Sequence, residues 1–212
     1  MADLDVDALQ RWLRAFAASI AEQQDDLTAL DAAIGDADHG ANMHRGMTAV
    51  VDALPTTPVG PAALLKQTGM VLIRTVGGTS GPLYGTLFLR MASAAGDETT
   101  LAPETFAKAW RAGVEGLVAR GKAELGDKTL YDALGPAVDA LDASLADGES
   151  LAAALRAASA AADRGRDATT PMVARKGRAS YLGERSAGHQ DPGATSAALL
   201  VAAAATAVSE GA

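Results

Sequence analysis

Cysteine is absent from this chain of 212 residues, which excludes disulfide bonds, thiolate metal sites and a cysteine nucleophile. Aromatic residues make up only 4% of the sequence, whereas alanine and leucine are abundant, and this composition favours helices over strands. The most apolar stretch, residues 197–205, is far shorter than the ~20 residues of a membrane span and predicts a buried helix. The acidic N-terminus lacks the features of a secretory signal. We therefore expect a cytoplasmic protein with no membrane partner.

Basic residues are in the minority, and the formal net charge is −8. Non-specific binding of nucleic acids depends on neutralising phosphates with lysine and arginine, so we do not expect a nucleic-acid partner. A chain of this length buries a sizeable core without covalent cross-links, and we expect one domain that covers residues 1–212.

Apolar residues recur with the 3.6-residue period of amphipathic helices, as in Leu9, Leu13, Phe16 and Ile20. The predicted helices cover residues 4–31, 41–54, 61–75, 80–95, 103–120, 131–145, 150–164 and 192–209. Mostly short links favour antiparallel packing between successive helices. The sequence thus predicts an all-α fold, an antiparallel eight-helix up-and-down bundle.

Four links of this predicted bundle are polar or rich in glycine, and an up-and-down arrangement brings them to the same end. They cover residues 31–42, 77–81, 121–129 and 164–191. The links at the opposite end, residues 55–60, 96–102 and 147–149, have the composition of ordinary turns. We therefore expect any ligand site to lie where the four polar links meet.

Three aspartates, Asp31, Asp36 and Asp38, lie within eight residues of the first polar link. Carboxylates suit Mg²⁺ or Ca²⁺, and Mg²⁺ usually completes its coordination with water and substrate phosphates. The spacing differs from that of an EF-hand, which needs a longer loop and a terminal glutamate. A solvated loop whose aspartates cap helices explains the same residues, so the cluster alone leaves both interpretations open.

The second polar link, the run GGTSGP at residues 77–82, offers accessible backbone N–H groups and the dipole of the following helix to a phosphate. It is not a P-loop, because GxxxxGK[ST] is absent, and no strand precedes it as in the dinucleotide-binding pattern. A tight turn with Thr79 or Ser80 as a helix cap is the alternative interpretation.

The last polar link is basic, although the chain as a whole is acidic. Its basic residues are Arg164, Arg166, Arg175, Lys176, Arg178 and Arg185, against Asp167 and Glu184. Arginine suits phosphate contact, and a loop of this length without a pattern of its own is usually functional or disordered. A flexible lid without ligand contact is the alternative. His39, His44 and His189 lack the spacing of a zinc site, and His39 and His189 suit nucleotide contact better than proton transfer.

Five motifs resemble the L subunit of dihydroxyacetone kinase and the equivalent domain of the ATP-dependent kinases of that family. They are LDAAIGDADHGANMHRG, GGTSGPLYGT, GDKTLYDAL, GRASYLGERSAGH and QDPGATS, and they cover nearly the whole chain. The resemblance implies a barrel of eight antiparallel helices with a nucleotide, ADP or ATP, at one end. It also implies that Asp31, Asp36 and Asp38 hold two Mg²⁺ ions that bridge the nucleotide phosphates.

The same resemblance implies nucleotide contacts in all four polar links. The implied residues are His39, Gly40, Ala41, Asn42, Thr79, Ser80, Gly121, Leu130, Arg178, Asp191, Pro192 and Gly193. No catalytic residue is predicted, because phosphoryl transfer needs mainly positioning and charge neutralisation.

Three functions agree with this resemblance. The first, favoured by the free-standing length, is the nucleotide-binding subunit of a kinase of the phosphotransferase-system branch. In that branch a phosphohistidine protein rephosphorylates ADP, and the phosphoryl group passes to dihydroxyacetone on a separate K subunit. The second is an ATP-dependent kinase subunit for another small ketose. The third is a regulatory relative without turnover, and the intact aspartates argue against it.

Overall fold

The computed structural model describes residues 3–55 and 60–209, and all regular elements in these two ranges are helices. They are α1 (Val6–Glu22), α2 (Gln24–Ile34), α3 (His39–Asp52), α4 (Pro61–Thr75), α5 (Ser80–Ala95), α6 (Pro103–Gly121), α7 (Leu130–Ala146), α8 (Leu151–Ala168), the 3-10 helix η1 (Arg178–Ser186) and α9 (Pro192–Ser209). Leu4 and Leu101 form an isolated antiparallel bridge. The predicted all-α class is confirmed. The turn expected at residues 55–60 lies largely outside the described residues.

Three predicted helices, α4, α5 and α9, have the bounds that the sequence indicated. Pro61 and Pro192 stand at the first positions of α4 and α9, where the missing N–H of proline interrupts no helical hydrogen bond. The bounds of α3, α6 and α7 differ from the prediction by one or two residues. Helix ends fray, so differences of this size carry no structural meaning.

The prediction of one helix over residues 4–31 is wrong, because the chain breaks between α1 and α2. Gln23 is the break, with φ −102° and ψ 16°, and its N–H still donates to the Ser19 carbonyl. Residues 22–26 are all polar, so no apolar side chain there holds the helix to the core. Burial resumes at Leu27 on α2, which ends only at Ile34.

The last polar link also differs from the prediction. α8 continues to Ala168, four residues beyond the predicted end, and residues 178–186 form η1. Gly183, with φ 54° and ψ −131°, kinks η1. The segment thus has structure of its own, which its weak apolar pattern did not indicate.

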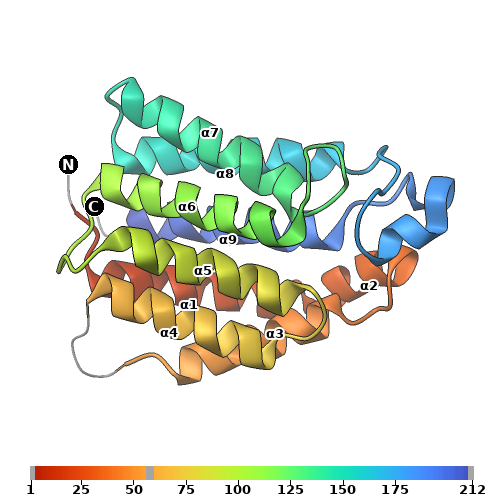
Figure 1. Cartoon of the computed structure of the whole chain (residues 1–212), viewed down its shortest axis with the longest axis horizontal. Helices are drawn as coiled ribbons and strands as arrows, with labels where there is room; N and C mark the ends of the chain where they lie inside the picture. Colours follow the sequence, from red (N-terminus) through yellow and green to blue (C-terminus); the bar gives the residue numbers. More distant parts are fainter. Residues whose placement is uncertain (1–2, 56–59, 210–212) are drawn as a thin grey trace.

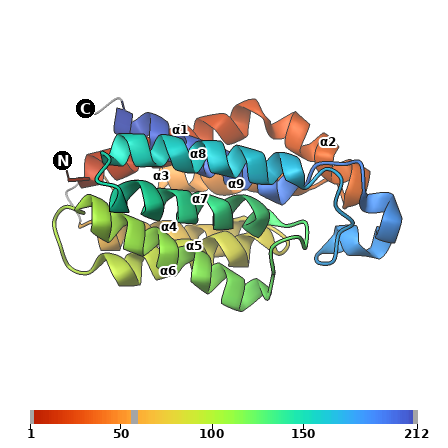
Figure 2. The ribbon, with the colours of Figure 1, turned by 90° about the horizontal axis from the view of Figure 1, so that it is seen from above.

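The long helices lie side by side along one direction (Figure 1), and their contacts close them into a ring. From α3 to α9 each α-helix packs on the next, α9 packs on α1, and α1 packs on α3. α1 begins and α9 ends at the left of Figures 1 and 2, and the four polar links lie at the right. The closed arrangement that the family resemblance implied is therefore present.

α9 is a largely buried member of this ring and packs against α1, α7 and α8. The indole Nε1 of Trp12 on α1 donates to the Leu200 carbonyl of α9 at 3.0 Å. Trp12 also stacks on Trp110, with ring centroids 5.4 Å apart. Among the described residues α9 is the one helix long and apolar enough to cross a membrane by length and composition, but 67% of it is buried in the bundle. The prediction of a buried alanine-rich helix is confirmed.

Candidate functional site

One cavity opens where the four polar links meet, and residues of all four line it. Twelve of the predicted site residues line this cavity: Asp31, Asp36, Asp38, His39, Asn42, Thr79, Ser80, Leu130, Arg178, Asp191, Pro192 and Gly193. Gly40, Ala41 and Gly121 lie outside its wall. A Cβ on Gly40 would lie 2.1 Å from the Gln24 carbonyl oxygen, so this glycine permits close packing of α3 on α2.

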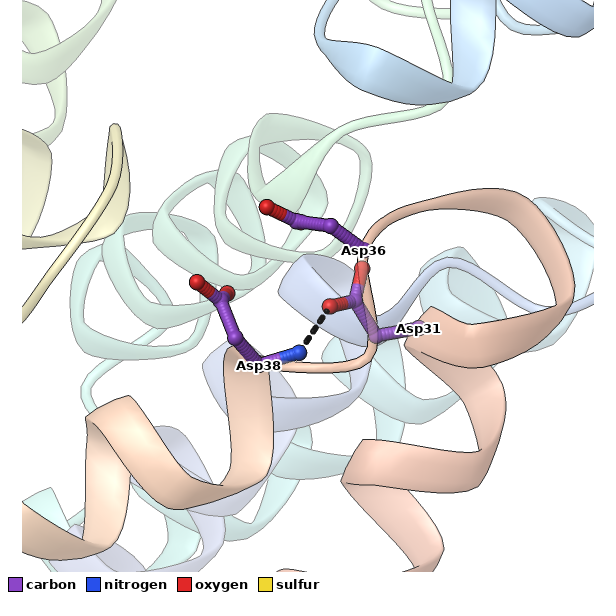
Figure 3. Close-up of side chains that lie close together, drawn as sticks. All are labelled: Asp31, Asp36 and Asp38. Atoms are coloured by element: carbon purple, nitrogen blue, oxygen red, sulfur yellow. Dashed lines mark hydrogen bonds between the residues drawn. The ribbon is translucent and has the colours of Figure 1, made fainter.

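The carboxylates of Asp31, Asp36 and Asp38 converge at the end of α2 (Figure 3). One oxygen from each lies within 4.8 Å of the others. Asp31 is buried at the end of α2, and its Oδ2 accepts the backbone N–H groups of Asp38 at 2.8 Å and His39 at 3.1 Å. Asp36 and Asp38 are exposed to the cavity. Three hard oxygen donors with an open side fit a Mg²⁺ ion that takes its remaining ligands from phosphates and water.

The turn between α2 and α3 has a backbone that brings these carboxylates together. A Cβ on Gly35 would lie 2.0 Å from Oδ1 of Asp31, so the chain folds back on Asp31 only with glycine there. Ala37 lies in the left-handed region, with φ 60°, between the two exposed aspartates. Such strain at a non-glycine residue costs on the order of 1–3 kcal/mol and is concentrated at functional sites.

The structure supports only part of the interpretation in which these polar residues cap helices. Asp38 precedes α3, but its side chain makes no capping hydrogen bond. Thr79 precedes α5, and it too makes none. The start of α3 is capped instead by the Asp31 carboxylate, so the Asp38 carboxylate remains free to point into the cavity.

The glycine-rich link crosses the start of α3 at close range. A Cβ on Gly77 would lie 2.7 Å from Oδ1 of Asn42, and that oxygen accepts a hydrogen bond from Arg45. Gly78 has φ 62° and no atom within 4 Å of its Cβ position, so it is open on that side. Backbone N–H groups in such a link, together with the start of α5, form a suitable cradle for a phosphate.

Arg178 begins η1 and faces the aspartates across the cavity. Its Nε lies 3.0 Å from Oδ2 of Asp36, and both residues are exposed. An ion pair in this setting adds little to stability. It does show that the basic segment reaches the carboxylate cluster, and arginine is well suited to phosphate oxygens.

His39 lies at the floor of the cavity in a buried chain of hydrogen bonds. Its Nδ1 lies 3.3 Å from the Ser80 hydroxyl and its Nε2 lies 2.9 Å from the Ser196 hydroxyl. Ser196 also accepts from the Tyr84 hydroxyl at 2.7 Å if its own proton goes to the Gly193 carbonyl. Burial lowers the pKa of His39, although the charges of Asp31 and Asp38 oppose this shift. The ring is therefore a neutral link between α3, α5 and α9.

Asp191 caps α9 from inside the protein, where its Oδ2 accepts the Ala194 N–H at 2.7 Å. Burial raises the pKa of Asp191 to about 7, although that hydrogen bond opposes the shift. The charge of Asp132 raises this pKa further, and that of Lys128 lowers it.

The sequence did not identify Lys128, Tyr84 or Ser196 as parts of the site. Lys128 lines the cavity, and Tyr84 and Ser196 lie beneath it. The run Gly-Asp-Lys-Thr was recognised only as a turn and a motif, and nothing local marks its lysine as buried. Tyr84 and Ser196 are 112 residues apart, so only the folded chain shows that they meet.

Comparison with known proteins relates this arrangement to one family. Residues 33–206 match the family model described as the DAK2 domain. The chain is 47% identical to the ADP-binding subunit DhaL of the PEP-dependent dihydroxyacetone kinase of Escherichia coli, over 90% of this chain and 91% of that protein. It is 43% identical to the corresponding subunit of kinase 1 of Listeria innocua, over 92% of this chain and 93% of that one.

A solved structure shares the fold. The dihydroxyacetone kinase of C. freundii in complex with AMP-PNP and Mg²⁺ superposes with a TM-score of 0.71 at 25% identity, over 97% of this chain. The chain spans only 35% of the length of that kinase. The family model covers most of the sequence, and the two bacterial relatives match this chain almost from end to end. The chain therefore belongs to the DAK2 domain family.

Proposed function

We propose that the chain is the nucleotide-carrying subunit of a dihydroxyacetone kinase. It holds ADP or ATP with Mg²⁺ as a single cytoplasmic domain over residues 1–212. The phosphoryl group passes to dihydroxyacetone on a partner K subunit. A phosphohistidine protein then restores ATP from the bound ADP. The names of the E. coli and L. innocua relatives support this reading, because both are ADP-binding subunits of PEP-dependent kinases.

The observation that carries the proposal is the joint placement of three carboxylates, a glycine-rich link and an arginine around one cavity. We assign Asp31, Asp36 and Asp38 as the Mg²⁺ ligands, with Thr79 and Ser80 beside the phosphates. The other predicted contacts that line the cavity complete the nucleotide site. Gly40, Ala41 and Gly121, which lie outside the cavity wall, stay predictions.

The residues of the chain position the phosphates rather than move protons. Mg²⁺ held by the carboxylates would neutralise phosphate charge, and Arg178 adds a second positive group at the same end of the bundle. Both ring nitrogens of His39 already face hydroxyl groups, so this histidine is not placed to accept a substrate proton. We propose that the base that takes the proton of the dihydroxyacetone hydroxyl comes from the chain that holds the sugar.

The end of the bundle that carries the cavity also exposes apolar side chains. Tyr181 on η1 is 87% exposed, and Leu125 in the link between α6 and α7 is 55% exposed. Tyrosine is enriched in protein interfaces, so we propose Tyr181 as a contact with a partner. A K subunit that docks here would bring its sugar to the open side of the nucleotide site.

Reconstitution tests the proposed function. The chain is mixed with a K subunit, a phosphohistidine donor protein, dihydroxyacetone, Mg²⁺ and catalytic ADP, and dihydroxyacetone phosphate is measured. We expect sustained product formation only when the donor is phosphorylated. Product from ATP alone at many turnovers would instead support the ATP-dependent alternative, with other small ketoses tested in place of dihydroxyacetone. Tight nucleotide binding without any product would support a regulatory role.

A further inference from the structure

Lys128 has an unusual position in the link between α6 and α7. Its side chain is buried, with a relative exposure of 1%. Its backbone lies in the left-handed region, with φ 64°, which is uncommon for a residue other than glycine. A lysine is almost never fully buried unless its ammonium group has partners, so the surroundings must supply them.

The partners of this ammonium group are backbone carbonyls of a single later segment. Nζ donates to the carbonyl oxygens of His189 at 2.6 Å, Ser186 at 2.7 Å and Met172 at 3.0 Å, and the Thr170 carbonyl lies at 3.5 Å. An ammonium group has three N–H donors, and three close acceptors use all of them. Burial lowers the pKa of Lys128, and the charge of Asp191 opposes this shift.

These carbonyls flank the basic segment, residues 175–185, that carries Arg178. The segment is held to the same link at a second point, because the Arg175 N–H donates to the Asp127 carbonyl at 3.0 Å. The residues on either side of the segment also contact each other, because the Ser186 hydroxyl accepts the Ala174 N–H at 2.8 Å. The loop thus closes around the Lys128 ammonium group with its ends fixed, and two of its basic residues, Lys176 and Arg178, line the cavity.

We propose that Lys128 is a positioning residue that fixes the basic segment over the nucleotide site, and that it does not bind phosphate itself. It acts through Arg178, whose place beside Asp36 depends on the closed loop. The part of the proposal that concerns the nucleotide rests on the proposed function. The anchoring of the loop does not.

The geometry separates this role from that of a phosphate-binding lysine. Lys128 lines the cavity, as a phosphate ligand would. The Thr170 carbonyl also accepts the Gly188 N–H at 2.8 Å, but within the described residues Lys128 is the donor recorded for the carbonyls of Met172, Ser186 and His189. If the ammonium group moved to a phosphate, these three carbonyls would lose their donor, and buried carbonyls without donors are costly. We therefore expect the ammonium group to stay hydrogen-bonded to the loop carbonyls whether or not a nucleotide is bound.

Chemical labelling of lysines in the unmodified chain tests this commitment without a mutation. Acetylation by a limiting amine-reactive reagent is followed at each lysine by mass spectrometry, with EDTA alone and with ADP plus Mg²⁺. We expect Lys128 to react at least about 100-fold more slowly than the exposed Lys108 of α6, which lies outside the cavity wall, in both conditions, since the donors of Lys128 are occupied in both. Labelling of Lys128 at the rate of Lys108 once nucleotide is removed would overturn the proposal, because it would mark Lys128 as a phosphate ligand.

Substitution tests the consequence for the loop. Lys128→Met keeps the length of the side chain and removes its donors, and Lys108→Met on the exposed face of α6 is the matched control. By hydrogen exchange without nucleotide we expect residues 172–189 to lose protection in the first variant, while α1 and α5 keep theirs. Unchanged protection of residues 172–189 in a folded Lys128→Met chain would overturn the proposal. If that variant does not fold, the labelling experiment decides.

A double-mutant cycle tests the action through Arg178. Release of ADP is timed in Lys128→Met, in Arg178→Gln and in the chain with both changes. Loss of one charge-assisted hydrogen bond corresponds to about tenfold faster release, and two residues that act through one contact give a double variant little faster than either single one. Fully additive effects would overturn the proposed route. Failure of the unmodified chain to bind ADP would refute the proposed function. The anchoring of the loop by Lys128 would still be tested by the hydrogen-exchange and labelling experiments.

Discussion

The residues of the cavity fall into two groups. Some face the ligand, and others hold the ligand-facing residues in position. Asp36, Asp38 and Arg178 face the cavity, while Asp31 caps α3 and His39 links three helices. The ligand-facing residues could be predicted, because short runs of aspartate, glycine and arginine are visible in the sequence. Of the supporting residues, Asp31 and His39 were predicted to lie in the site, but Lys128 was not, since it meets its acceptors 44 and 61 residues further along the chain.

Arg178 should matter for nucleotide retention more than an arginine of the same charge elsewhere. Arg178→Gln removes the positive group beside Asp36, whereas Arg14→Gln changes an exposed position on α1. We expect ADP to dissociate about tenfold faster from the first variant, the effect of about 1.4 kcal/mol of lost interaction, and at the original rate from the second. Stopped-flow release of a fluorescent ADP analogue measures both. Equal rates of ADP release from the two variants would show that Arg178 acts only through the net charge of the chain.

Asp191 should make the stability of the nucleotide-free chain depend on pH. Its pKa is raised from 3.8 to about 7, so the folded chain holds this proton more tightly than the unfolded chain. Its contribution to stability is therefore lost as the pH rises through this range, by on the order of a few kcal/mol. The charges that face it are Asp31, Asp132 and Lys128. The lowered pKa of His39 acts in the opposite direction.

Asp191→Asn isolates this effect, because the amide oxygen can still accept the Ala194 N–H but carries no charge. Chemical denaturation in EDTA at several pH values measures the difference in stability between the variant and the unmodified chain. We expect this difference to shift in favour of the variant between pH 4 and pH 8. A difference that does not change with pH would show that the carboxyl group is not held neutral by burial.

At the scale of elements, the sequence identified the helices that carry a clear apolar period between glycine or proline boundaries. It missed the break at Gln23 and the whole of η1. Both lie where polar residues dominate, so these segments contain no apolar period from which a helix or its end could be predicted. η1 exists because the loop closes on Lys128 and Asp127, and these contacts are tertiary.

The packing of α7 on α8 depends on Gly165. A Cβ there would lie 2.1 Å from the Asp132 carbonyl oxygen, and a backbone atom cannot move aside. We expect Gly165→Ala to lower the free energy of unfolding by about 1–3 kcal/mol, the usual cost of overpacking. Gly116→Ala is the matched control, because its Cβ would meet the flexible Arg90 side chain. Urea denaturation measures both, and equal losses would show that the close approach of α7 and α8 is not the cause.

At the scale of the whole molecule, the ring of helices places all four polar links at one end. The alternation of helix and link was enough to predict this convergence, since each second link of an antiparallel bundle returns to the same end. Closure of the ring by α9 on α1 was implied only by the family resemblance. The spacing of apolar residues does not distinguish a closed ring from an open bundle.

The exposed aromatic group at the cavity end should contribute to association with a K subunit. We expect Tyr181→Ala to weaken this association about tenfold and leave ADP binding unchanged, because exposed aromatic residues often anchor interfaces. Met70→Ala, a partly exposed position on α4, is the control and should change neither. Calorimetric titration with the K subunit measures the affinity. An unchanged affinity in Tyr181→Ala would place the contact elsewhere.

Native mass spectrometry of the chain with ADP and Mg²⁺ tests the nucleotide site most directly. The resemblance and the three converging carboxylates predict one ADP and two Mg²⁺ ions on each chain, all lost together on treatment with EDTA. Asp36→Asn should lose metal-dependent ADP binding, while Asp147→Asn at the opposite end of the bundle should retain it. An unmodified chain that takes up no ADP, or an Asp36→Asn chain that binds ADP and both ions as before, would show that the aspartates do not hold the nucleotide.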